Sequence, residues 1–325
     1  MATRPSQLLD LVERRQTVQD SAIEDFEERL FALSENLGRR LGASLGVDPD
    51  EVRPPDGDDG RRVGRTTIEE LISGLGDADA IRAAVLASSL EEVEELIDAA
   101  GLGDARGEIR ATVGRIAGIA ERSVTIQGVI DAEGALDTVA AEALLGNYIE
   151  TSIDDALFGT LSRQSATRIK DALTSNLGLE DMLTVARRIA DSEEVSVPMA
   201  VTEARTRLAQ ADRFVNDVVR QSVDPDGDLM VLAYLGPADG ITRGFCDRLV
   251  NKAFEVDDFN SANNAQTPSH PRVSGGGYNC RHNIVPVSRE SVEDLGLTVG
   301  TIDDVRAAND AAISARRKKG RRRKR

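Results

Sequence analysis

Apolar residues recur at three- and four-residue spacing in the first part of the chain, which is the period of one face of an α-helix. From Pro5 to Gly46 this pattern predicts one long helix of the kind that forms a bundle or a coiled coil. Gln16 and Gln19 share the phase of the stripe, which indicates a register-setting role or a solvated gap. We expect the helix to pack on its own chain, with a seam between copies as the alternative. The stripe consists of Leu9, Val12, Ile23, Phe26, Leu30, Leu33 and Leu37.

The middle of the chain alternates between breaks and helical patterns. Proline, glycine and acidic residues from Asp48 to Arg62 are typical of a linker. Two later segments, Thr-Thr-Ile-Glu-Glu and Ser-Ser-Leu-Glu-Glu, each lead to Gly-Leu-Gly-Asp, which predicts two short capped helices that end at glycine. Helical spacing from Asn147 to Ile189 predicts an antiparallel pair, and Pro198 is expected to open a further helix that ends near Asp224.

The last third of the chain changes character. The apolar segment from Leu229 to Leu235 predicts a strand, and a further helix is expected from Ser291 or Thr301 to Ala315. The fold class is therefore mainly α: multi-helix N-terminal and central regions with a small α+β C-terminal domain organised around a Cys/His cluster. The expected order is a helix at 1–47, an acidic linker at 48–65, a small helical region at 66–145, a helical region at 146–224, the Cys/His domain at 225–300, a helix at 301–315 and a basic disordered tail at 316–325.

Composition supports a helical core and reveals a charge asymmetry. With 3% aromatic residues and no tryptophan among 325 residues, the core must consist of Ala, Leu, Ile and Val, which suits closely packed helices. The net charge is −16, although residues 316–325 hold nine of the 40 Lys and Arg residues, so the remainder is strongly acidic. No run of about 18 apolar residues is present, so no membrane contact is expected.

Every cysteine and histidine of the chain lies between Tyr234 and Val287. Two thiolates and two imidazoles are a complete tetrahedral ligand set for Zn²⁺. Residues i and i+2 of an extended segment point to the same side, and the three glycines from Gly275 to Gly277 permit the chain reversal that a compact site needs. The sequence therefore predicts a structural zinc site, whose ligands are Cys246, His270, Cys280 and His282.

Three alternatives for the same residues remain, because the spacing is not that of a zinc finger. The two cysteines can be ordinary buried thiols. They can form a disulfide, which requires an oxidising compartment, and the N-terminus shows no signal peptide that would direct the chain to one. A Cys/His nucleophilic pair is the third alternative, and it would need an orienting third group.

The segment that holds these residues resembles a known family. A G-P-x-D-x-x-T-R-x-F-C pattern, a G-G-Y-N-C-R-H pattern and a closing Val-Pro-Val are similar to the C-terminal motif of the minor head, or head morphogenesis, proteins of tailed bacteriophages and proviruses, the phage Mu F-like family. The resemblance covers about Asn147 to Val287. It departs from the family at Gly244 and at Asn283-Ile284. The matching residues are Thr202 to Thr206, Gly236, Pro237, Asp239, Thr242, Arg243, Phe245, Cys246 and Gly276 to His282.

This resemblance implies a structural protein without catalytic activity. It would associate with the portal protein, the major capsid protein or both during head assembly and DNA packaging. Its expected place is the virion head, at the portal vertex or in the interior, and the host cytoplasm during assembly. The alternative functions are a zinc-dependent hydrolase or nuclease that uses the Cys/His cluster, and a nucleic-acid-binding protein that acts through its tail.

The basic tail is the candidate contact for packaged DNA or for an acidic surface of a neighbouring subunit. Like charges at this density repel one another and oppose compaction. Binding through such a tail is independent of nucleic-acid sequence and weakens steeply with salt. The candidate residues are Arg316, Arg317, Lys318, Lys319, Arg321, Arg322, Arg323, Lys324 and Arg325.

Overall fold

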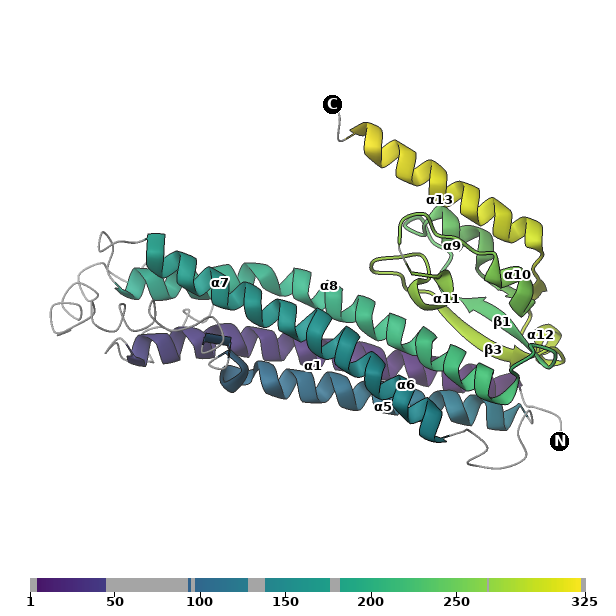
Figure 1. Cartoon of the computed structure of the whole chain (residues 1–325), viewed down its shortest axis with the longest axis horizontal. Coiled ribbons are helices and arrows are strands. Elements are labelled where there is room, and N and C mark those ends of the chain that lie inside the picture. The colour runs from purple at the N-terminus through teal and green to yellow at the C-terminus, as the bar shows by residue number, and fades with distance from the viewer. Residues whose placement is uncertain are drawn as a thin grey trace. The chain divides into compact units, whose positions relative to one another are not determined.

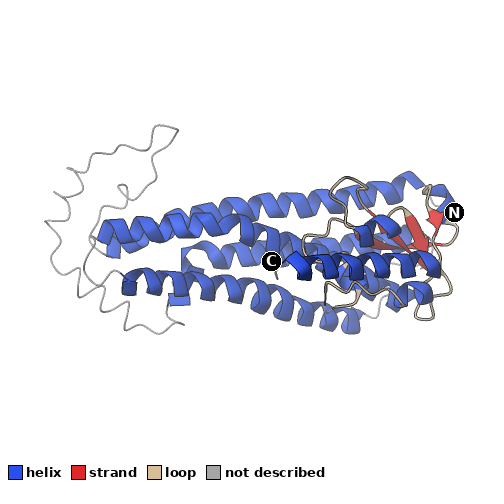
Figure 2. Cartoon of the chain, turned by 90° about the horizontal axis from the view of Figure 1, so that it is seen from above, coloured by secondary structure: helices blue, strands red, loops and turns tan. Residues whose placement is uncertain are grey.

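The structure, a computed structural model, is mainly helical, and the strands of the described residues all lie in the C-terminal part (Figures 1 and 2). This agrees with the fold class expected from the sequence. The residues described are 5–44, 93–94, 97–127, 138–175, 182–267 and 269–322.

The described residues up to 223 are nearly all helical, and most of these helices are long. The C-terminal part contains short helices, four strands and a final long helix. The helices of the first part are α1 (Pro5–Ser44), η2 (Asp98–Leu102), α5 (Gly103–Ile126), α6 (Thr138–Tyr148), η3 (Ile149–Gly159), α7 (Thr160–Ser175) and α8 (Met182–Val223). The later elements are β1 (Met230–Leu235), α9 (Gly244–Leu249), β2 (Lys252–Phe254), α10 (Val256–Asn260), α11 (Pro271–Ser274), β3 (Asn283–Ser288), α12 (Ser291–Asp294), β4 (Thr298–Val299) and α13 (Ile302–Arg322).

Helix α1 forms as predicted, and Val12 and Gln19 of the expected stripe face inward, but Leu9 and Gln16 do not. Leu8 and Leu11 are buried, whereas Leu9 is 45% exposed. The prediction was wrong here because Leu8-Leu9 and Leu11-Val12 are adjacent apolar pairs, so either phase fits the helical period. Gln16 is also exposed, and it donates a hydrogen bond to Asp20 on its own helix.

The apolar stripe of α1 is covered by the chain itself from Leu8 to Leu33. A seam between copies would therefore have to use other residues of this helix.

One further expectation for the central region needs correction, because Pro198 lies inside α8 instead of opening a helix. In the segment where a helix pair is expected, the residues up to Ser175 belong to one continuous helical stretch that starts at Thr138 and includes the π-helical segment η3, and α8 begins at Met182. The first capped segment, at 66–77, lies outside the described residues. The second ends as expected, because Gly101, inside η2, has φ 138° and interrupts the helical backbone there.

The chain divides into two compact units, each assembled from separate segments. The boundaries fall within helices and do not follow the expected sequential regions, although α8 ends at Val223, close to the expected boundary at 224. Unit 1 comprises Met1–Ala22, Arg110–Ser152 and Thr202–Arg325. Unit 2 comprises Ile23–Ile109 and Ile153–Val201.

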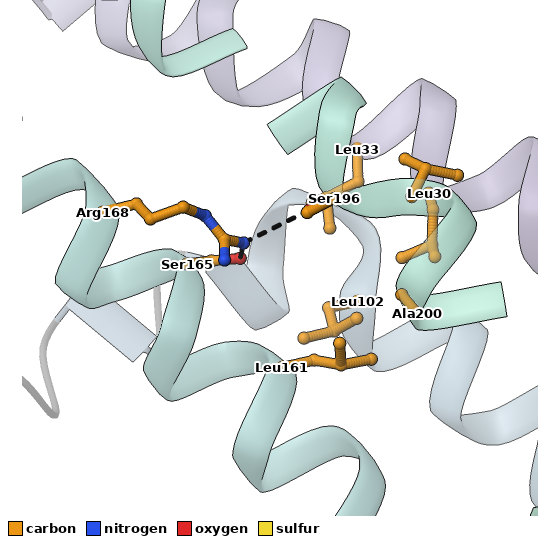
Figure 3. A pocket seen from close by; sticks show the side chains of 9 residues that line it. Leu30, Leu33, Leu102, Leu161, Ser165, Arg168, Ser196 and Ala200 are labelled. Atoms are coloured by element: carbon orange, nitrogen blue, oxygen red, sulfur yellow. Dashed lines mark hydrogen bonds between the residues drawn. The ribbon is translucent and has the colours of Figure 1, made fainter. Parts of the chain in front are cut away.

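Unit 2 has a helical core with few aromatic side chains. The ring of Phe26 meets that of Phe158 edge to face, with centroids 5.9 Å apart. A cavity of about 20 Å³ is lined by leucines, beside the Arg168 side chain that donates to Ser165 and Ser196 (Figure 3). This volume holds little more than one water molecule, so the cavity is a packing defect of the helical core.

Unit 1 contains a four-stranded sheet of order β3-β1-β2-β4. Strand β1 pairs antiparallel with β2 and β3, and β2 pairs parallel with β4. The outer edge of β3 is covered by Gln127, which accepts a hydrogen bond from Ser288 N and donates one to Pro286 O. This contact protects an edge that would otherwise offer free peptide groups to another strand.

Strand β1 is apolar along its whole length because both faces of the sheet are covered. Leu232 and Tyr234 face a cluster that contains residues of α9, α10 and α13, and Figure 1 shows α13 lying along α9. Val231 and Ala233 face the opposite way, toward Leu8 of α1 and Val292 of α12. Successive residues of β1 therefore point to opposite faces of the sheet, as in any pleated strand.

Helix α13 begins as the sequence predicts and ends later than it predicts. Thr301 and Asp304 form a capping box: Asp304 Oδ2 accepts from Thr301 N, and Asp304 N donates to Thr301 Oγ1. The helix continues to Arg322, so residues 316–322 extend the helix and are not a separate disordered tail after Ala315. Among the described residues, no helix combines the length and apolar character that a bilayer span requires.

Candidate metal centre

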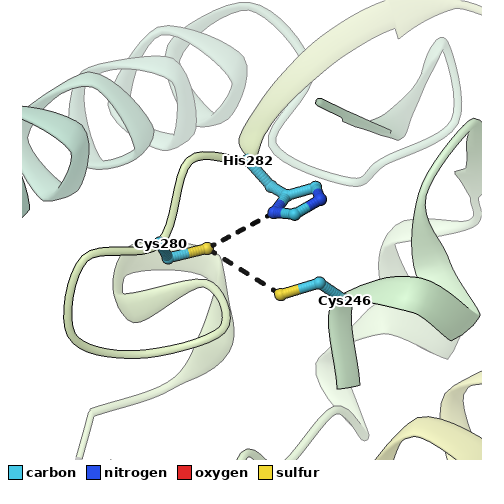
Figure 4. A group of neighbouring side chains, drawn as sticks. All are labelled: Cys246, Cys280 and His282. Atoms are coloured by element: carbon cyan, nitrogen blue, oxygen red, sulfur yellow. Dashed lines mark hydrogen bonds between the residues drawn. The ribbon is translucent and has the colours of Figure 1, made fainter. Parts of the chain in front are cut away.

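Three of the four predicted ligands converge at one buried point of unit 1 (Figure 4). Cys246 lies on α9, Cys280 follows the glycine loop, and His282 directly precedes β3. The two Sγ atoms are 3.9 Å apart, and Cys280 Sγ lies 3.8 Å from His282 Nδ1. The ligand atoms of all three residues lie within 4.8 Å of one another. This Cys₂His group could hold a metal ion.

The glycine loop brings the backbone against the sulfur atoms. A Cβ added at Gly276 would overlap Cys246 Sγ and would lie 3.3 Å from Cys280 Sγ, so only glycine fits this close approach. Gly276 N also donates a hydrogen bond to Cys280 Sγ at 3.1 Å. The loop therefore both makes room for the thiols and directs an N–H group at one of them.

The tautomer of His282 follows from its surroundings. Its Nε2 lies 3.0 Å from Pro237 O, and a carbonyl oxygen can only accept, so Nε2 carries the proton. Nδ1 then presents its lone pair toward Cys280. A metal-binding histidine commonly donates its other N–H to a carbonyl in this way, which fixes the ring.

The two thiols differ in acidity because one donates to the other. The hydrogen bond from Cys246 lowers the pKa of Cys280 well below its usual value, against the effect of burial, and the charge of Arg213 and the backbone N–H of His282 add to this lowering. The hydrogen bond with Cys280, followed by burial, raises the pKa of Cys246. Burial raises the pKa of Tyr234, whose hydroxyl donates to Cys246 Sγ at 3.3 Å. Cys280 is therefore the first thiolate of the group.

His270 does not belong to the group, and its prediction as a ligand is corrected. It is exposed, and it caps α11 by accepting a hydrogen bond at Nδ1 from Arg272 N. Its Nε2 contacts Asn260 O at 3.1 Å. Proline follows it as predicted, but Pro271 starts a short helix that holds the imidazole at the surface.

Helix α8 supports the site through Arg213, which the sequence did not reveal, and through Thr206, which ends the matching run from Thr202. Arg213 is 1% exposed and donates to Val273 O and to His282 O, both at 2.7 Å. Thr206 Oγ1 accepts from Asn279 N, beside Cys280. Arg213 lies between the buried residues Ala211 and Val215 of α8, and no local pattern separates a buried arginine of this kind from a surface one.

The motif residues next to the cysteines bind the surrounding loops to one another. Arg281 Nη2 donates to both carboxylate oxygens of Asp239, at 2.9 and 2.8 Å, and this contact lowers the pKa of that carboxyl. Thr242 Oγ1 donates to Pro237 O. Arg243 donates to Gly276 O and to Tyr278 O. Each contact joins the loop before α9 to itself or to the segment from Gly276 to Arg281.

The basic residues expected to contact nucleic acid lie apart from the cysteine group, at the end of α13. Arg316 and Arg317 have exposed side chains. Residues 318–322 continue the helix, and 323–325 lie outside the described residues.

Comparisons of the chain with protein-family models, with curated proteins and with solved structures found no match. Function is therefore argued from the site and from the motif resemblance.

Proposed function

We propose that this chain is a structural minor head protein of a tailed virus or provirus, and that a zinc ion at Cys246, Cys280 and His282 stabilises its C-terminal domain. It joins the portal protein, the capsid protein or both during head assembly. The motif resemblance supplies the biological setting. The contacts of the motif residues support a structural role, because Asp239, Arg243 and Arg281 bind backbone or one another instead of lining a reactive centre.

Zinc is the metal that fits these ligands best. Thiolates and imidazole select zinc over magnesium or calcium, which prefer oxygen ligands. A Zn–S bond of about 2.3 Å in a tetrahedron places two sulfur ligands about 3.8 Å apart. The observed separation of 3.9 Å between the sulfurs is close to that edge, and the 3.8 Å between Cys280 Sγ and His282 Nδ1 is slightly longer than the sulfur–nitrogen edge of about 3.6 Å.

A three-residue ligand set leaves one coordination position, as catalytic zinc sites do. Two observations favour the structural role over a hydrolase or nuclease. Cys246, Cys280 and His282 are each at most 4% exposed, whereas a substrate must reach catalytic zinc. Among the described residues, the group also contains no carboxylate to serve as the general base that zinc hydrolysis uses.

The test is copurification from an assembly extract. Full-length chain serves as bait, and its His282→Ala and His270→Ala variants serve as matched baits that each lose one histidine. We expect the wild type and His270→Ala to retain the portal or capsid protein, and His282→Ala to retain less because its terminal domain is loosened. If no bait retains either protein, and purified particles contain no copy of the chain, the structural assignment is wrong.

A further inference from the structure

A second pocket lies beside the glycine loop, on the outside of unit 1. Its volume is about 550 Å³, within the range of small-ligand sites. Segments far apart in the sequence meet there: the start of α9, the loop before residue 268, the glycine loop and α13. The pocket is lined by Arg243, Ala265, Gln266, Thr267, Gly276, Gly277, Tyr278 and Arg316.

The charge of this pocket is opposite to that of the whole chain. Two arginines line it, no lining residue is acidic, and the chain carries a net charge of −16. Several other arginines of unit 1, such as Arg207, Arg272 and Arg289, pair with carboxylates. Within the described residues, Arg243 and Arg316 instead donate to backbone carbonyls. Their positive charges are therefore not neutralised by an acidic side chain.

The arginines are also held in position. Arg243 is fixed by Gly276 O and Tyr278 O, and Arg316 Nη1 donates to Ala265 O at 3.1 Å. A guanidinium has five N–H donors, so each keeps donors for an anion after making these bonds. Planar guanidinium groups bind phosphate oxygens in pairs, and anchoring them in advance reduces the entropy lost on binding.

An exposed aromatic side chain and a basic helix next to the pocket favour nucleic acid as the anion that binds there. Tyr278 is 48% exposed at the pocket, and exposed aromatic rings next to arginine stack on nucleobases. Burial raises the pKa of Tyr278, and Glu203, whose carboxylate is paired with Arg207, adds to this effect. After Arg316 the sequence of α13 continues as RKKGRR, so a polyanion bound at the pocket would meet further positive charge.

We propose that the pocket formed by Arg243, Tyr278 and Arg316 binds a phosphodiester group of nucleic acid. An acidic protein segment would supply carboxylates for the arginines, but it has no nucleobase to stack on Tyr278, so nucleic acid fits the pocket better. The assignment does not depend on the chain being a head protein, and it goes beyond charge attraction by the tail because it fixes one site on the folded domain.

The experiment measures binding of the full-length chain to fluorescently labelled DNA of about 12 nucleotides, single-stranded or duplex, by anisotropy at several salt concentrations. Arg316→Gln and Arg317→Gln form a matched pair, because each removes one exposed charge from α13 and only Arg316 lines the pocket. We expect Arg316→Gln to weaken binding about tenfold and to reduce the salt slope by about one, and Arg317→Gln to weaken it less than about threefold.

Equal losses of DNA affinity in the two glutamine variants would overturn the proposed site, because diffuse attraction by the charges of α13 would then explain the binding.

Tyr278→Ala should weaken binding to the single strand more than binding to the duplex, whose bases are already stacked. An unchanged affinity for the single strand would contradict the contact between Tyr278 and a nucleobase. Displacement of both DNA probes by polyglutamate at equal charge concentration would assign the pocket to an acidic protein surface instead. Unaltered melting temperatures for the two glutamine variants show that the fold is intact.

Discussion

Two buried groups of polar side chains in unit 1 compensate for the loss of water in different ways. In the cysteine group, neutral or weakly acidic side chains direct their lone pairs at one point. In the helical part, Arg15 of α1 forms an ion pair with Asp212 of α8 at 3.1 Å, and Gln19 and Asn216 donate to the same carboxylate. Arg15 and Asp212 are at most 1% exposed.

The two groups differ in how their charges are balanced. Asp212 is satisfied by neighbouring side chains, and Arg15 has its counter-charge, although Arg15 Nε and Nη2 find no acceptor among the described residues. Such a pair sets register between two helices and contributes little net stability, because desolvation offsets attraction. In the cysteine group, Arg213 helps to lower the pKa of Cys280, but the pKa of Cys246 is raised, so the group by itself favours one thiolate and not two. A bound cation would stabilise the second thiolate, so we expect the cysteine group to depend on an added component and the ion pair to form without one.

The largest expected effect is loss of the metal. We expect wild type and His270→Ala to bind about one zinc ion per chain, and His282→Ala to bind far less. Structural zinc contributes on the order of 10 kcal/mol of apparent binding free energy in small domains, so His282→Ala should lower the melting temperature by about 10 °C or more. Elemental analysis and thermal unfolding measure both.

A chelator provides the control for this prediction. EDTA should lower the melting temperature of the wild type to that of His282→Ala and leave the variant unchanged. Equal zinc content in the two histidine variants would contradict the assignment of the ligands and would remove the contrast between the two buried groups.

The ion pair should show an intermediate effect that depends on charge. Asp212→Asn keeps the hydrogen-bonding shape but leaves Arg15 charged and unpaired, at an expected cost of about 3–5 kcal/mol in the free energy of unfolding. The double variant Arg15→Met with Asp212→Asn removes both charges and keeps an amide that can bond Gln19 and Asn216. It should recover most of that loss in urea denaturation, and neither variant should change the zinc content. A double variant as unstable as the single one would show that the unpaired charge is not the cause.

Substitution of the glycine that contacts the cysteines should give the smallest of the three losses of stability. Gly276→Ala places a methyl group against Cys246 Sγ, so we expect a loss of about 1–3 kcal/mol together with weaker zinc binding. Gly240→Ala is the matched control in a nearby loop, since nothing lies within 4 Å of its added Cβ. The control should stay within about 0.5 kcal/mol of the wild type. Denaturation and zinc titration of both variants compare the sites, and equal behaviour would mean that the glycine loop is not held against the sulfur.

The sequence by itself determined the features that depend on local pattern. Apolar patterns predicted α1, the helical class and the strand β1, and Thr301 was one of the two starts expected for the helix that the structure shows as α13. Composition also directed attention to Cys246, Cys280 and His282, because such residues are rare in this chain and occur close together.

Only the tertiary structure decided which of several equivalent residues are used. The period of a helix cannot separate Leu8 from Leu9, and spacing cannot show that His270 caps a surface helix while His282 turns inward. From the sequence, Arg15, Asp212 and Arg213 would be placed at the surface. In the folded chain their partners come from positions about 60 to 200 residues away, so their burial cannot be predicted locally. Helical propensity and rarity of residue type are local properties, whereas burial and pairing arise from contacts that only the folded chain creates.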